Sequence, residues 1–268
     1  MKCGISTACL YPMDTLRCLE TTAFLTPACA EIFLNTFSEL EPDYVEYLYQ
    51  LQKQCGLHIA SVHPFSSEME SFFFFTDYET RFEDGLRLYR RYFEICQQLG
   101  AKVLVFHGNR SGRTEVSMEK YAQRFCRLCA EGEKYGILVA QENVERCQCG
   151  HPENIYQLLQ YADRPISFAL DLKQALRAQV PPMEMVQAMG AKNICHLHLS
   201  DSDTQSDCIL PGKGTFDFTT LFHTLLCNGY TGDAVVELYR NGYKTPDQLV
   251  DAAHYLQKIA DRMKEEQP

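Results

Sequence analysis

A regular alternation of strand-like and helical segments constrains the fold of this chain more than any other feature. Short apolar runs typical of buried strands lie at residues 3–7, 29–34, 57–62, 102–107, 137–142, 166–171, 193–199 and 233–238. Helical patterns lie at residues 14–25, 43–55, 79–99, 117–135, 152–161, 182–189, 216–228 and 245–264. Eight strand–helix pairs make a (β/α)8 barrel, which typically needs ~250 residues, and the chain has 268. We therefore predict an α/β fold, a (β/α)8 TIM barrel that forms a single domain over residues 1–268.

A doubly wound open sheet is the main alternative, because it also alternates strands with helices. Such a sheet normally carries a glycine-rich phosphate turn after its first strand, and here that segment reads ACLYPMD. Gly56, Gly100, Gly136 and Gly190 each stand between a helical segment and a strand, where a left-handed helix end is expected. No linker or low-complexity run interrupts the pattern, so the barrel is favoured.

Composition and net charge limit which kinds of binding partner the protein is expected to have. Hydrophobic residues make up 46% of the chain and charged residues 22%, both near globular averages, so a large core can form. The net charge of −10 repels phosphate backbones, so we expect no nucleic-acid partner. No apolar run approaches ~18 residues and the start does not resemble a signal peptide, so we expect no membrane span and a cytoplasmic protein. The thirteen cysteines are then expected to be reduced thiols.

Four ligand-type side chains stand at the ends of strand-like runs: Glu142, Asp171, His198 and Glu237. Active-site groups of a (β/α)8 barrel come from the carboxyl ends of its strands, so these four should meet. Three carboxylates and one imidazole suit one divalent metal ion, such as Mn²⁺, Mg²⁺, Co²⁺ or Zn²⁺. The alternative is that Glu142 and Glu237 only pair with basic residues of the barrel.

Two further histidines, His63 and His107, follow the third and fourth strands. A lone histidine at a strand end is more often structural, but candidates on six strands are harder to dismiss. His196 shares the strand parity of His198 and lies one layer deeper, where a hydrogen-bonded core histidine is expected.

The stretch HLHLSDSD…DCILPGKGTFDFTTLF…LLCNGYTGDAVVELYR, with the upstream SVHPF, VFHG, QENV and LDLKQA, resembles the xylose isomerase-like barrel superfamily. Its members include sugar and sugar-phosphate isomerases and epimerases, and the endonuclease IV type of apurinic-site nuclease. The resemblance implies that Glu142, Asp171, His198 and Glu237 hold one divalent ion. It also implies that Glu142 and Glu237 are the catalytic acid/base pair, and that His63 and His107 hold further zinc ions in the nuclease branch.

The chain departs from the family pattern at two places. Gln174 stands where the family usually has a histidine that contacts substrate oxygens, and Ser206-Asp207-Cys208 replaces the usual Asp-x-His. These replacements disfavour a trinuclear zinc site. Gln174 can still donate and accept hydrogen bonds to a substrate.

Several other residues are candidates for substrate binding. Lys173 should point the same way as Asp171 if the strand alternation persists, where it could hold a carboxylate or phosphate. Arg240, His63, His107 and Gln174 complete the predicted substrate-binding set. Arg110, Arg113 and Lys213 lie in loops near the expected mouth and could recognise an anion, or could simply be solvated.

We therefore predict a metal-dependent isomerase or epimerase that acts on a sugar, sugar phosphate or inosose-type substrate through an enediolate. The alternatives are an apurinic-site phosphodiesterase and a non-catalytic sugar-binding barrel that has lost part of its site. The aromatic segment PFSSEMESFFFFTDYETRF is expected to be either a lid over the mouth or a homo-oligomer contact.

Overall fold

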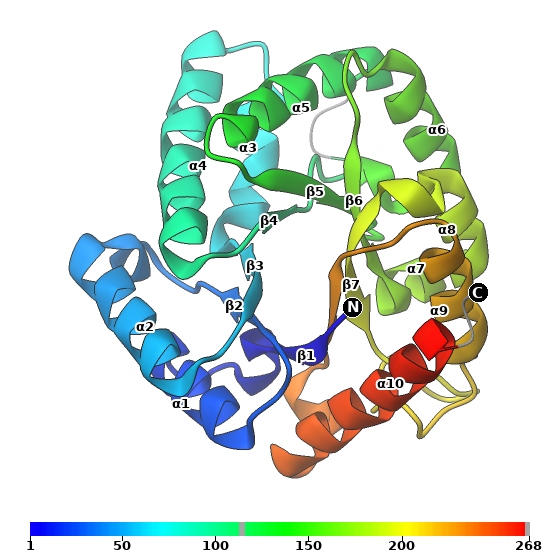
Figure 1. The fold of residues 1–268 in the computed structure, drawn as a ribbon. Coiled ribbons are helices and arrows are strands. Elements are labelled where there is room, and N and C mark those ends of the chain that lie inside the picture. The colour runs from blue at the N-terminus through cyan, green and yellow to red at the C-terminus, as the bar shows by residue number, and fades with distance from the viewer. Residues whose placement is uncertain (113–115, 266–268) are drawn as a thin grey trace.

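Eight parallel strands close into a barrel in the computed structural model, which describes residues 1–112 and 116–265 (Figure 1). The strands are β1 Cys3–Ser6, β2 Ala30–Phe33, β3 Ile59–His63, β4 Val103–Phe106, β5 Leu138–Glu142, β6 Ser167–Asp171, β7 Ile194–Leu199 and β8 Asp233–Val236. Pairing of β1 with β8, which sets Ile5 opposite Val236, closes the ring. The predicted (β/α)8 fold is confirmed, and the open-sheet alternative is excluded.

Helices surround the barrel as an outer layer (Figure 1). Those foreseen from the sequence are α1 Thr15–Leu25, α2 Pro42–Cys55, α4 Glu79–Leu99, α5 Met118–Glu133, α6 Pro152–Tyr161, α8 Pro182–Met189, α9 Phe218–Cys227 and α10 Asp247–Glu265. Two short helices were not foreseen, α3 Glu70–Phe74 and α7 Leu172–Arg177. Both occupy connections that leave the carboxyl ends of strands, which is the end that carries the site.

The strands are continuous apolar runs because both of their faces are covered. Every residue of β1 and of β4 is buried, as expected where helices pack outside a barrel that side chains fill. Gly56 and Gly100 end α2 and α4 with φ of 63° and 73°. This confirms the left-handed helix ends expected at these two positions.

The aromatic segment after β3 is mostly folded into the protein. It forms a 3-10 turn, η3 Phe65–Met69, and then α3. Phe74 and Phe75 are fully buried, and both pack against Phe106 of β4. Only Phe72 and Tyr78 remain largely exposed. The aromatic residues therefore serve mainly as core, which neither sequence interpretation anticipated.

The first and last elements meet at the amino-terminal end of the barrel. The Lys264 ammonium lies 3.5 Å from the Met1 carbonyl, and the Cys3 amide donates to the Gln257 side chain at 2.8 Å. All thirteen cysteines are free thiols. Among the described residues, no helix combines the length and apolar character needed to cross a membrane.

Candidate active site

Four strand ends bring Glu142, Asp171, His198 and Glu237 together. Glu142 and Asp171 are the last residues of β5 and β6, His198 is in β7, and Glu237 directly follows β8. The parallel register sets Asp171 opposite His198. Each residue offers one ligand-type atom, and these atoms all lie within 4.8 Å of one another. The sequence expectation that the four side chains meet is confirmed.

The His198 ring lies between three carboxylates on one side and a fourth carboxylate, that of Glu31, on the other. Its Nδ1 lies 3.0 Å from Glu142, 3.5 Å from Glu237 and 3.9 Å from Asp171. Its Nε2 lies 3.0 Å from Glu31 Oε2 on the other side. Burial lowers the pKa of His198, but the surrounding carboxylates, Glu237 and Glu31 foremost, hold that pKa well above its ordinary value.

Glu31 is a site residue that the sequence reasoning missed. It lies in β2, is fully buried, and accepts hydrogen bonds from Ser6 at 2.9 Å and Ser61 at 2.7 Å. Its Oε2 also lies 3.2 Å from His196 Nε2, so His196 is the hydrogen-bonded core histidine that was expected. A lone carboxylate inside the strand run CAEIFL was the available signal, because an acidic residue is rarely buried without a partner.

His63 and His107 lie next to Glu142. His107 Nε2 lies 2.9 Å from Glu142 Oε2 and 3.0 Å from His63 Nε2. His63 Nδ1 donates to the Pro64 carbonyl at 3.2 Å, and its Nε2 lies 3.9 Å from Glu142 Oε2. Burial opposes ionisation of Glu142, but His107, His198 and His63 together hold its pKa well below the ordinary value.

Lys173 places a positive charge among the same carboxylates. Lys173 is only 4% exposed, and its ammonium contacts both Asp171 Oδ2 and Glu237 Oε2. Burial would lower the pKa of Lys173, but Asp171 and Glu237 raise it well above its usual value. Burial raises the pKa of Asp171 to about 7, against the lowering effect of Lys173. The predicted orientation of Lys173 toward the site is confirmed.

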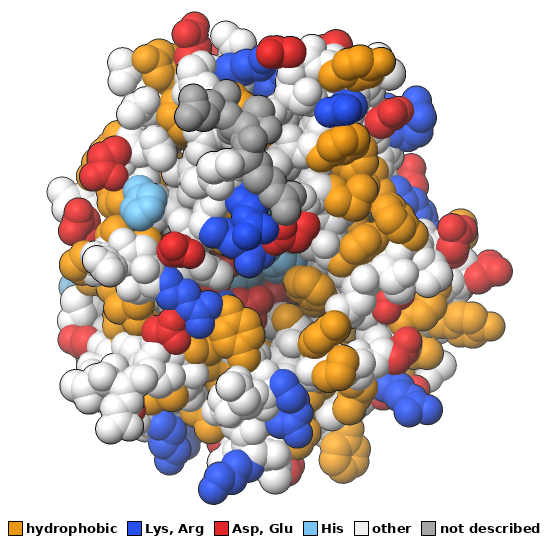
Figure 2. Space-filling model, turned by 180° about the vertical axis from the view of Figure 1, so that it is seen from behind, with side chains coloured by type: hydrophobic (Ala, Val, Ile, Leu, Met, Phe, Trp, Pro, Cys, Tyr) orange, Lys and Arg blue, Asp and Glu red, His pale blue; other side chains and the backbone are white. Residues whose placement is uncertain are grey.

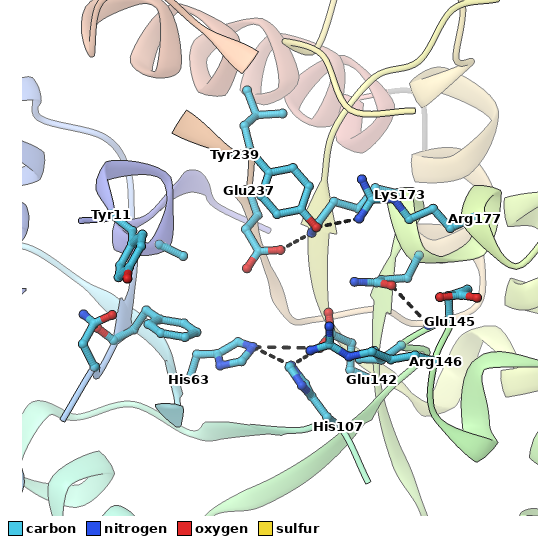
Figure 3. A pocket seen from close by; sticks show the side chains of 16 residues that line it. Tyr11, His63, His107, Glu142, Glu145, Arg146, Lys173, Arg177, Glu237 and Tyr239 are labelled. Atoms are coloured by element: carbon cyan, nitrogen blue, oxygen red, sulfur yellow. Dashed lines mark hydrogen bonds and ion pairs between the residues drawn. The ribbon is translucent and has the colours of Figure 1, made fainter. Parts of the chain in front are cut away.

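A cavity of about 390 Å³ opens above these groups. Figure 2 shows the hollow, with acidic and histidine side chains at its floor and basic side chains at its rim. Figure 3 shows the lining from close by. The apolar lining residues are Ala8, Tyr11, Phe33, Val144, Leu238 and Tyr239, and the polar ones are Asn35, His63, His107, Glu142, Glu145, Arg146, Lys173, Gln174, Arg177 and Glu237. The volume falls in the range of small-molecule sites, roughly 300–1,000 Å³.

The predicted substrate-binding residues divide into two groups. His63, His107, Lys173 and Gln174 line the cavity. Arg240 does not, because the 3-10 turn Arg240–Gly242 turns its guanidinium over the Tyr243 ring at 4.8 Å.

The other basic candidates lie at the edge of the site or away from it. Arg110 is held by Glu68 at 3.0 Å, and Lys213 lines a separate surface depression with Tyr255. Arg113 lies outside the described residues. Arg146 and Arg177, which the sequence reasoning did not name, line the cavity instead.

The four-residue cluster suits a divalent metal ion. Two buried carboxylates, Glu142 and Asp171, and the partly buried carboxylate of Glu237 converge with an imidazole nitrogen. Three carboxylates in one buried cluster also need more positive charge than Lys173 supplies. Carboxylate and imidazole donors suit Mn²⁺, Mg²⁺, Co²⁺ and Zn²⁺ alike, so the donor set does not choose among them.

Comparison with known proteins agrees with this architecture. A sequence model of the xylose isomerase-like TIM barrel family matches residues 26–259. A D-tagatose 3-epimerase-like protein superimposes with a TM-score of 0.81 at 20% identity, covering 99% of each chain. No curated protein sequence matches the chain.

Two further solved structures are similar. D-psicose 3-epimerase of Clostridium cellulolyticum H10, solved with D-tagatose, has a TM-score of 0.76 at 14% identity, covering 98% of this chain and 99% of its own. The IOLI protein, solved with a zinc atom, has a TM-score of 0.76 at 20% identity with the same coverage. Since the family match spans most of its length, the chain belongs to the xylose isomerase-like TIM barrel family.

Proposed function

We propose that this xylose isomerase-like barrel is a divalent-metal-dependent isomerase or epimerase of a sugar or polyol-derived ketone. The observation that carries the proposal is the convergence of Glu142, Asp171, His198 and Glu237 beneath a cavity of about 390 Å³. The printed descriptions of two similar structures, an epimerase solved with D-tagatose and a barrel solved with zinc, support the same reading. The compartment we propose is the cytoplasm, since free thiols suit reducing conditions. Homo-oligomer formation stays a prediction.

Glu142 and Glu237 are the proposed proton-transfer pair. They approach the cavity from different sides (Figure 3). One carboxylate takes the proton from the carbon next to the substrate carbonyl, and the other returns a proton, so the product has the same composition. Either glutamate can begin as the ionised base, while its partner carries the proton that is returned. His107 and His198 keep the pKa of Glu142 low against burial, and His198 and Lys173 do so for Glu237.

The remaining groups hold the substrate and stabilise charge. Glu142, Asp171, His198 and Glu237 would hold the ion, which supplies polarisation of the substrate carbonyl and its neighbouring hydroxyl. The Lys173 ammonium lies beside these ligands, where it stabilises negative charge that develops on a substrate oxygen. Gln174 and Asn35 offer neutral donors and acceptors for hydroxyl groups.

Substitution of the two glutamates tests the proposal. With Mn²⁺ present and a panel of ketoses and inososes as substrates, Glu142→Gln and Glu237→Gln should each lower turnover by ~10²–10⁴-fold. Metal content is measured in each variant, because the amide also weakens ion binding. Variants that keep the ion and the full turnover would contradict the assignment.

One observation favours a second candidate, the apurinic-site phosphodiesterase. His63, His107 and Glu142 also place their donor atoms within 4.8 Å of one another, which would suit a second ion. The phosphodiesterase would need further zinc ligands, which the described residues do not supply. Gln174 stands where the family usually has a histidine and accepts the Glu145 amide at 3.1 Å, and Asp207 is paired with Arg177. Metal analysis of the purified protein separates the candidates. One ion per chain supports the isomerase, and two or three zinc ions support the phosphodiesterase. A chain that binds no ion supports a non-catalytic sugar-binding barrel.

A further inference from the structure

We infer that the cavity takes a sugar without a phosphate or carboxylate group, and that Asp207 is a residue that sets this preference. The inference rests on the proposed function and names the substrate class of the same cavity. The observation behind it concerns Arg146, Lys173 and Arg177, the lysine and arginine side chains that line the cavity in the described part of the chain. Each of them already contacts a carboxylate of the protein.

Arg177 of α7 is held by Asp207 from the loop after β7. Its Nε donates to Asp207 Oδ2 and its second terminal nitrogen lies 3.3 Å from Oδ1, so the pair is bidentate. The first terminal nitrogen donates to the Tyr239 hydroxyl at 2.5 Å, and the guanidinium stacks on the same ring at 5.0 Å. A bidentate carboxylate uses the donor geometry that a phosphate or carboxylate ligand would need.

Arg146 also contacts a carboxylate, that of Glu68, which it shares with Arg110. Its terminal nitrogen lies 2.6 Å from Glu68 Oε1, and Arg110 lies 3.0 Å from Glu68 Oε2. Glu68 comes from η3, so the segment after β3 supplies one negative charge to the two arginines. Figure 2 shows this pattern at the rim, where acidic side chains stand beside the basic ones.

The remaining charges of the cavity are unfavourable for an anion. Lys173 is paired with both Asp171 and Glu237. Glu145 lines the cavity with no ion pair among the described residues, so the lining leaves a carboxylate, and no lysine or arginine, without a partner. A bound anion would have to displace a protein carboxylate or lie close to one, and like charges in contact repel each other.

The uncharged lining suits a sugar with free hydroxyl groups. Asn35, Gln174 and the Tyr239 hydroxyl can each donate and accept hydrogen bonds. The rings of Tyr11 and Phe33 provide an apolar wall for the C–H face of a sugar. These neutral groups recognise hydroxyls without attracting an anion.

Removing one neutralising carboxylate tests the inference. Asp207→Asn frees the Arg177 guanidinium. Asp203→Asn makes the same charge change in the same loop, where the Asp203 carboxylate accepts from the backbone amides of Gln205 and Ser206 and from no other group in the described part of the chain. Inorganic phosphate is titrated into metal-free wild type and both variants by calorimetry. We expect phosphate affinity to rise about tenfold in D207N alone, and the gain to vanish in the double variant D207N/R177Q.

Kinetics with D-fructose and D-fructose 6-phosphate complete the test. Wild type should prefer D-fructose, and D207N should reduce that preference by about tenfold. The inference is overturned if wild type binds phosphate as well as D207N does, or if it uses the phosphorylated sugar equally well or better. Phosphate binding gained in D207N without turnover of any sugar would leave the inference standing and count against the proposed function.

Discussion

His198 shows how one side chain of the site depends on residues behind it. Its Nδ1 faces the three carboxylates that we propose as metal ligands, and its Nε2 faces Glu31 at 3.0 Å. A carboxylate on the far nitrogen fixes the tautomer and the ring orientation of a metal-binding histidine, and it raises the basicity of the ligating nitrogen. Glu31 is itself held by Ser6 and Ser61, so the orientation of His198 is set two contacts away from the cavity.

Replacing Glu31 should therefore weaken metal binding without removing any ligand. We expect Glu31→Gln to lower the affinity for Mn²⁺ by ~10–100-fold, the usual effect of losing such a partner. Calorimetric titration measures it, with the exposed Glu41→Gln as the charge-matched control. Ser61→Ala, which removes one hydrogen bond to Glu31, should give a smaller loss and serves if E31Q does not fold. Unchanged Mn²⁺ affinity in folded E31Q would refute the role of Glu31.

Metal binding should also depend on pH in a defined direction. Burial raises the pKa of Asp171 to about 7, and the carboxylates around His198 raise its pKa against burial. A raised pKa means that each ligand keeps its proton to higher pH, and a bound ion must displace that proton. The affinity for the ion should thus increase as pH rises through about 7, and it should decrease as pH is lowered below about 7. Competition with a chelating dye at fixed ionic strength measures this, and an affinity independent of pH would contradict it.

At the scale of elements, two short helices carry more of the site than their length suggests. Helix α7 begins at Leu172 and is capped by Asp171, whose Oδ1 accepts the Gln174 amide at 3.2 Å. The same carboxylate is thus a proposed metal ligand and the helix cap, and the six residues of α7 deliver Lys173, Gln174 and Arg177 to the cavity. Helix α3 begins at Glu70, which accepts from Tyr89 and from the Gly108 amide, both at 2.5 Å. Glu70 thereby fixes the turn that follows His107.

The burial of Glu70 makes a prediction about stability. Burial raises the pKa of Glu70 well above its ordinary value, so the native protein binds this proton more tightly than the unfolded chain. The stability gained from the neutral carboxyl is present at low pH and lost as pH rises through the native pKa. Glu70→Ala should lower the free energy of unfolding by about 1–3 kcal/mol, because the Gly108 amide and Tyr89 hydroxyl lose their acceptor.

Glu70→Gln is the matched control, because its amide oxygen can accept from the Gly108 amide while its NH2 group donates to the Tyr89 hydroxyl. It should match wild type near pH 5 and exceed it as pH rises. Urea unfolding at several pH values measures the difference. Equal losses in E70A and E70Q at every pH would show that the charge state of Glu70 is irrelevant.

At the scale of the whole molecule, the proposed ligands tie one half of the barrel together. They come from β5, β6, β7 and from the residue after β8, and β8 closes the ring on β1. An ion bound at the four ligands therefore stabilises the native barrel and has no equivalent site in the unfolded chain. This links metal binding to global stability.

Thermal unfolding tests that link. At an Mn²⁺ concentration of about one hundred times Kd, binding should add ~2.7 kcal/mol. For a chain of this size that corresponds to a rise in Tm of roughly 5–10 °C relative to protein in chelator. His198→Ala should abolish the rise, while His223→Ala on the exposed face of α9 should keep it. An identical Tm with and without the ion would argue against the site.

The sequence by itself determined the barrel and the four-residue cluster. Eight apolar runs of strand length separated by amphipathic helices leave few ways to bury every strand, and parallel strands in a closed ring must end on the same side. Inward-facing side chains at the carboxyl ends of the strands therefore meet, and strand position predicted this for Glu142, Asp171, His198, Glu237, His63 and His107.

Only the tertiary structure decided which other residues complete the site. Glu31 acquired its role because the barrel interior sets β2 near β7, a contact that strand order alone does not reveal. The pairing of Arg177 with Asp207 joins helix α7 to the loop after β7 across 30 residues, and the turn over Tyr243 keeps Arg240 out of the cavity. Strand positions could be predicted because they depend on local periodicity in the sequence. Loop and side-chain conformations could not, because they depend on contacts between distant segments.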